Sequence, residues 1–350
     1  MSEQEETAGR RREGRLSSLP HVWCFTIYFA EGFPFTLFRT VSSVFFRDLK
    51  VSLEGIGLTS LYGLPWTLKF LWAPQVDEFS TKRSWMLWIQ SLIAVVILAV
   101  GLFARESGVQ VIATLFFVGA ILAATHDVAI DGYYLAALDQ EGQARFLGWR
   151  VMAYRMAMMT GTGVIVTVGT TTSWHAAFLL AGGLFALISV YHWFLLPKTE
   201  TPAKPASQLA SAVFAPKVLG IAALIGLAIW GLRVGLASPG LTELKAASPI
   251  WKQVNFPNAI SALLLAALTG LGLFRGKLQA MLAARSDSFY ARAFVDFMSQ
   301  RRIGTILAFV ILLRTGEFML SSMVSPFIVD LGIKEHYGWL SGAVGLPCSI

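Results

Sequence analysis

The stretch GAILAATHDVAIDGYYLAAL (Gly119–Leu138) decides the fold, because it has the composition of a buried helix and yet contains two carboxylates. Asp127 and Asp131 are four residues apart, so they lie on the same face of a helix. Carboxylates in such a helix are hydrated, paired with cations or used to carry protons. Which of these applies depends on the surroundings of the helix, and so on the rest of the chain.

The chain has too few charged residues to cover a water-facing surface. Of its 350 residues, 55% are hydrophobic and 14% are charged, with a mean hydropathy of +0.61, whereas a soluble domain has about 25% charged residues. About 20 apolar residues cross a bilayer core as a helix. Such runs occur at 21–44, 55–76, 85–104, 110–137, 147–171, 175–196, 217–236, 257–274 and 304–329, and another begins near 337. We therefore expect an all-α polytopic membrane protein.

Basic residues gather in every second connection between these runs, for example at 10–15, 82–83 and 275–302. An excess of Lys and Arg marks cytoplasmic loops, so the N-terminus is predicted to be cytoplasmic. This alternation explains the net charge of +7 without a nucleic-acid partner. Cys24 and Cys348 both fall in apolar runs and offer neither a disulfide framework nor metal-ligand spacing, and no cofactor is expected.

The runs group into segments that resemble a two-half transporter. We expect a disordered cytoplasmic tail (1–20), a six-helix bundle (21–197), a connector (198–303) and the start of a second bundle (304–350). The connector would hold a polar linker (197–208), two extra membrane helices and a helix lying on the membrane surface (276–302), for which an ordinary solvated linker is the alternative. A complete second half needs roughly five more helices, so the sequence is expected to be a fragment.

Ionisable side chains inside membrane spans cost about 2.5–3.5 kcal/mol each and mark ion or substrate pathways. The candidate proton-coupling residues are Asp131, Asp127, Glu31 and Glu317. The candidates for binding an anionic substrate are Lys69, Arg155, Arg314 and Arg39. Asp131 is the stronger of the paired acids, because Gly132 lets a neighbouring helix or solute approach closely. The alternative is that these charges only hold helices together, above all Arg150, which lies near the membrane surface.

Three segments carry a family resemblance. They are YGLPWTLKFLWAPQVDEF (Tyr62–Phe79), ATHDVAIDGYYLAALDQEGQARFLGWRVMAYRMAMMTGTG (Ala124–Gly163) and LLRTGEFMLSSMVSPFIVDLG (Leu312–Gly332). Together they resemble the AmpG-type muropeptide permeases, in the peptide–acetyl-CoA transporter branch of the major facilitator superfamily. The resemblance implies proton-driven uptake of large anionic or amphiphilic solutes and two extra helices between the halves. It also implies that spans 1, 2, 4 and 5 border the central cavity, and these are the spans of the first bundle that contain the charges.

The sequence therefore predicts a secondary active transporter that imports a muropeptide-like or other large anionic solute by alternating access, driven by protons. We expect a monomer in a bacterial cytoplasmic (inner) membrane. A siderophore or acyl-CoA-type cargo is the alternative within this branch, and an integral membrane enzyme or a receptor is the alternative from another class. An enzyme should have a compact nucleophile–base or metal set, and the sequence contains none; the H-x4-D spacing at 126–131 lies inside a membrane helix.

Overall fold

The computed structural model describes residues 20–104, 108–198, 204–205, 216–248 and scattered positions from 251 to 344. All the named elements in these ranges are helices, which confirms the predicted all-α membrane class. Four helices are long and apolar enough to cross a membrane: Lys82–Phe103, Val109–Ala137, Gln140–Thr171 and Trp174–Leu195. They coincide with the third to sixth predicted runs.

The first predicted span is a continuous helix with a wider turn in its middle. Helix α2 (Pro20–Thr36) passes into the π-helical turn η1 (Leu37–Val41) and then into α3 (Ser42–Asp48). Pro34 has no backbone N–H, so the carbonyl four residues earlier loses its α-helical partner. The π turn follows closely, and such turns are frequent at functional sites. The backbone hydrogen-bond ladder of the first span is therefore interrupted within a few residues of Glu31.

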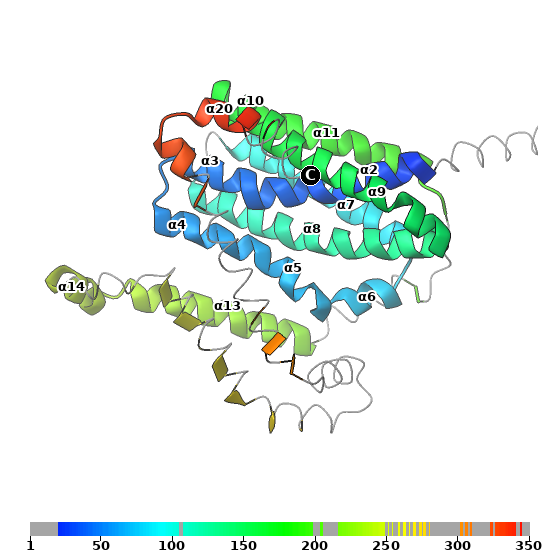
Figure 1. Ribbon diagram of the computed structural model, residues 1–350. Coiled ribbons are helices and arrows are strands. Elements are labelled where there is room, and N and C mark those ends of the chain that lie inside the picture. The colour runs from blue at the N-terminus through cyan, green and yellow to red at the C-terminus, as the bar shows by residue number, and fades with distance from the viewer. Residues whose placement is uncertain are drawn as a thin grey trace, which may run out of the picture. The chain divides into compact units, whose positions relative to one another are not determined.

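The second predicted span is divided into short pieces, although the sequence suggested one uninterrupted run. Pro65 and Pro74 each lie in the first turn of a new helix, where a missing N–H costs little. Several of these pieces contact α8 (Val109–Ala137), and Figure 1 shows the pieces following one another along one side of that helix. The pieces are α4 (Leu53–Gly57), η2 (Leu58–Gly63), α5 (Leu64–Leu68), η3 (Lys69–Leu71) and α6 (Ala73–Glu78).

Three of the remaining helices of the first bundle begin at side-chain caps. Thr81, Asp139 and Ser173 each accept a hydrogen bond from the backbone N–H three residues ahead, which satisfies one of the unpaired donors at a helix start. The cap at Asp139 explains why the fifth span begins at Gln140 rather than at the predicted residue 147. The helices are α7 (Lys82–Phe103), α8 (Val109–Ala137), α9 (Gln140–Met159), η4 (Thr160–Ile165), α10 (Val166–Thr171) and α11 (Trp174–Leu195).

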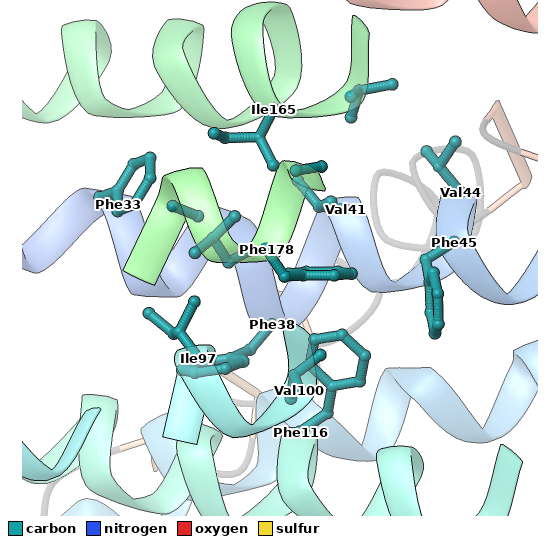
Figure 2. Packing of buried hydrophobic residues seen from close by; sticks show 14 of the residues in the cluster. Phe33, Phe38, Val41, Val44, Phe45, Ile97, Val100, Phe116, Ile165 and Phe178 are labelled. Carbon is teal, nitrogen blue, oxygen red and sulfur yellow. The ribbon is translucent and has the colours of Figure 1, made fainter. Parts of the chain in front are cut away.

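Aromatic rings fill the interior between these helices (Figure 2). Phe116 of α8 packs against Phe38, Phe45 and Phe178 with ring centroids 5.9, 6.0 and 5.6 Å apart. Gly119, one turn along α8, leaves room for Phe38, since a Cβ at this position would lie 2.3 Å from that ring. Dense packing of this kind holds the helix backbones, and hence the charged side chains on them, in fixed positions.

The chain divides into two compact units, one formed by Met1–Leu209 with Ser322–Ile350 and the other by Ala210–Ser321. In the second unit, α13 (Pro216–Leu236) matches the predicted run 217–236 and is followed by α14 (Pro239–Ala247). In the first unit, α20 (Lys334–Gly338) packs against α10 and η4. The predicted tail, the surface helix 276–302 and the runs 257–274 and 304–329 lie wholly or mostly outside the described residues.

Candidate functional site

Asp127 lies on α8, which is labelled in Figure 1. Its side chain is buried and pairs with Lys69. The Lys69 Nζ donates to Asp127 Oδ2, and the side chains are 33% and 12% exposed, respectively. Lys69 begins η3, one of the breaks in the second span. The break therefore brings a cation from the second span to the carboxylate of the fourth.

Glu31 of α2 lies beside the same carboxylate. Its carboxyl group is within hydrogen-bonding reach of the Asp127 carboxyl group and close enough to Asp131 to interact with its charge. The residue as a whole is half-buried, but its Oε2 atom has no contact with water and no hydrogen-bond donor among the described residues. Two carboxyl groups can share a hydrogen bond when one of them carries a proton, so this pair is suited to holding one.

Asp131 has different partners. Its Oδ1 accepts hydrogen bonds from the Tyr28 hydroxyl at 3.0 Å and from Arg150 Nη2 at 2.9 Å. The Arg150 guanidinium also lies over the rings of Tyr28 and Tyr134, 4.2 and 4.9 Å from their centroids. Charge-assisted hydrogen bonds and cation–π contacts both favour a fixed ion pair. Gly132, next in the chain, is approached by the Lys82 side chain of α7, since a Cβ there would lie 3.0 Å from Lys82 Cε.

Two further candidates, Arg39 and Arg155, lie near Tyr154 of α9. Arg39 belongs to the π turn η1, and its guanidinium stands 5.4 Å from the Phe35 ring centroid. It fits against Gly63 of η2, where a Cβ would lie 3.1 Å from Arg39 Cζ. The glycine thus makes room for the guanidinium. The remaining candidates, Arg314 and Glu317, lie outside the described residues.

Tyr154 was not singled out by the sequence, yet it links the two parts of the site. Its side chain lies near Glu31 and Asp127 on one side and near Arg39 and Arg155 on the other. Helix α9 can bring it there because α2 has Gly32 at the crossing, where a Cβ would lie 3.0 Å from the Tyr154 carbonyl oxygen. A glycine one residue after a membrane-embedded glutamate is the signal that could have indicated this close contact.

A second polar group lies within the bundle. His192 of α11 bonds through Nδ1 to Gln90 Oε1 at 2.8 Å and through Nε2 to Thr26 Oγ1 at 2.9 Å. His126 of α8 is also buried, with its ring edge toward Phe185 at a centroid distance of 6.3 Å. In the described ranges no group of three or more metal-ligating side chains forms.

Comparisons with known proteins give the family. The model of the Major Facilitator Superfamily matches residues 24–350. The anhydromuropeptide permease of Escherichia coli K12 is 27% identical over 194 residues, which cover 54% of this chain and 39% of that protein. An uncharacterized protein of Haemophilus influenzae is 27% identical over 161 residues, 45% of this chain and 38% of that protein.

The chain thus spans about two fifths of the length of these relatives. The superfamily model, by contrast, matches nearly the whole chain, and the helices long enough to cross a membrane fall within the matched range. The chain is a multi-pass membrane protein with AmpG-like relatives and belongs to the Major Facilitator Superfamily, a family of transporters rather than enzymes.

Proposed function

We propose that the protein imports a large anionic solute of the muropeptide class across a bacterial cytoplasmic membrane, driven by protons and by alternating access. Membership of a transporter superfamily and the named permease relative support the solute class. The observation that carries the proposal is the pair of carboxyl groups of Glu31 and Asp127, within hydrogen-bonding reach of each other and next to Lys69.

The Glu31–Asp127 pair is the proton site in this proposal. A shared hydrogen bond between carboxyl groups requires one proton, and repulsion between two ionised groups favours keeping it. The Glu31 Oε2 atom is shielded from water. A proton held there can exchange with one side of the membrane only after the helices around the pair move apart.

Asp131 has a positioning role. Its Oδ1 accepts hydrogen bonds from the Tyr28 hydroxyl and from Arg150, and these contacts fix the carboxylate between α2, α8 and α9. Although Gly132 made Asp131 the stronger candidate in the sequence, its contacts favour Asp127 and Glu31 as the proton carriers. Asp131 then holds Arg150, and through it the middle of α9, against α8.

Lys69 couples the solute to the proton. Its side chain is more exposed than that of Asp127, so an anionic group of the solute reaches the lysine first. When the solute pairs with Lys69, the Asp127 carboxylate loses its cation, and a proton can take the place of that cation. Solute binding thereby promotes proton binding. Arg39 and Arg155 are the further cations that would contact anionic groups of a large solute.

The placement of basic residues favours a cytoplasmic N-terminus, and the protein would act as a monomer, because each step above uses residues of one chain. In this orientation α2 begins at the cytoplasmic side and α3 ends at the outer side. A proton entering from outside would then reach Glu31 after opening of the Asp48 end of the bundle.

The proposal is tested by uptake of labelled anhydromuropeptide into proteoliposomes containing the full-length protein, with and without an inward proton gradient. The unchanged protein should accumulate the solute with the gradient and lose accumulation with a protonophore. Asp127→Asn and Glu31→Gln should lose accumulation but keep exchange of internal for external solute, because exchange needs no net proton movement. The matched control, Glu141→Gln, changes an exposed acid and should behave like the parent.

Gradient-independent accumulation, or accumulation by both variants equal to that of the parent, would refute the proton site. Competition identifies the cargo: an excess of unlabelled siderophore or acyl-CoA that abolishes uptake would assign the protein to the other solute classes. Recovery of chemically altered solute inside the vesicles would point to an enzyme.

A further inference from the structure

The Asp48 end of the first bundle is bound by a segment from the far end of the sequence. Arg47 of α3 makes a two-pronged ion pair with Asp330, from Nε to Oδ1 at 2.7 Å and from Nη2 to Oδ2 at 2.6 Å. The Arg47 Nη1 atom also donates to the Val51 carbonyl oxygen at 3.2 Å. Paired N–H donors that meet both carboxylate oxygens fix the orientation as well as the distance of the two groups.

A second ion pair lies beside the first with its charges reversed. Asp48 accepts a hydrogen bond from Lys334, at the start of α20, through Oδ1 and another from Trp174 Nε1 at 2.9 Å through Oδ2. The first bundle thus contributes the cation of Arg47 and, one residue later, the anion of Asp48. The later segment presents an anion and, four residues on, a cation. This reversed order fits only when each charge meets its own partner, because a shifted docking would place like charges together.

Apolar and close-packed contacts complete the docking. Tyr337 and Val329 are both buried among residues of the bundle core. Gly338 approaches Thr167 of α10 and the Gly163 carbonyl oxygen so closely that a Cβ would lie 2.1 and 2.6 Å from them. Figure 1 shows α20 lying against α10 at this end of the bundle. The segment therefore covers this part of α10.

We propose that the ion pairs Arg47–Asp330 and Asp48–Lys334 form a latch that holds the Asp48 end of the transport path closed. The inference rests on the proposed alternating access, in which one end closes while the other opens. The segment belongs to the region expected to begin the second bundle, so these pairs join the two halves. Their side chains are 17–47% exposed, so water can replace the partners and the latch can open repeatedly.

Thr167→Cys provides the reporter, because Gly338 covers this side chain when the latch is closed. The experiment uses the full-length protein in lipid nanodiscs, with Cys24 and Cys348 replaced by alanine, and measures the rate of labelling by a maleimide–polyethylene glycol reagent. Asp330→Asn and Asp48→Asn should each speed labelling about two- to five-fold, the range by which loss of a solvent-accessible ion pair shifts an equilibrium. The control, Glu141→Gln with Arg145→Gln, removes an exposed ion pair near the start of α9 and should label like the parent.

Charge exchange tests the pairing itself. Arg47→Asp combined with Asp330→Arg should return labelling toward the parent rate, whereas Arg47→Asp alone should label fast. Unchanged labelling in the Asn variants would overturn the latch, and so would a charge-exchanged pair that labels as fast as the single variant. If the single variants fail to insert into the membrane, the labelling rate of the charge-exchanged pair is compared with that of the parent. A rate like that of the parent supports the latch, and a faster rate overturns it. Labelling needs neither solute nor gradient, so its failure is distinguishable from failure of the uptake assay.

Discussion

Lys69→Gln is expected to lower the thermal stability of the first bundle, because it leaves the buried Asp127 carboxylate without its cation. Losing one partner of a fully buried pair costs about 3–5 kcal/mol, and losing an exposed pair costs about 0–1 kcal/mol. With side chains that are 33% and 12% exposed, this pair lies between the limits, at about 2 kcal/mol. At about 2–4 °C per kcal/mol, the unfolding midpoint should fall by about 4–8 °C.

The assay is thermal unfolding of the purified protein followed by tryptophan fluorescence, for Lys69→Gln, Asp127→Asn and the double variant. The double variant strands no charge, so its loss of stability should be smaller than the sum of the single losses by about 1–2 kcal/mol. Glu141→Gln is the control, since its side chain is 79% exposed. The inference that Lys69 and Asp127 stabilise each other would be refuted if a single variant unfolded at the same temperature as the parent. Losses of stability in the double variant that equal the sum of the single losses would also refute it.

Two further predictions follow from the packing and the charge pattern. Gly32→Leu should lower both the unfolding midpoint and solute uptake, because the leucine side chain would push Tyr154 and α9 away from α2. The control, Gly183→Leu, should change neither, since nothing lies within 4 Å of a Cβ at that position. Equal losses in the two variants would show that the α2–α9 contact is unimportant. Cysteines placed in 237–256 should react with an impermeant reagent from outside the cell and those in 198–215 should not, and the reverse result would contradict the cytoplasmic N-terminus.

Much of the fold was predictable because hydrophobic length alone identifies membrane helices. The runs at 85–104 and 110–137 gave the bounds of α7 and α8 to within a few residues. The division of the second span was not predicted, because Pro65 and Pro74 lower the mean hydropathy of a long run too little to divide it. Their effect appears only when each proline is recognised as a first-turn residue of a new helix.

The candidate site was predicted in part. Intramembrane charge identified Lys69 and Asp127, which the structure brings together, but charge gives no information on uncharged partners. Tyr28 and Tyr154 read as ordinary aromatic residues of apolar helices, and their roles arise from where α2 crosses α8 and α9. Likewise, Arg150 was favoured as a structural cation because it lies near the surface, and its contacts with Asp131 and two tyrosine rings agree with that interpretation.

The central claim, that Asp127 and Glu31 hold the transported proton, is tested most directly by proton movement itself. Full-length protein in proteoliposomes with a pH-sensitive dye inside should acidify the vesicle interior when anhydromuropeptide is added outside. Asp127→Asn should exchange solute without acidifying the interior. Solute entry without acidification in the parent, or acidification by Asp127→Asn equal to that of the parent, would contradict the claim.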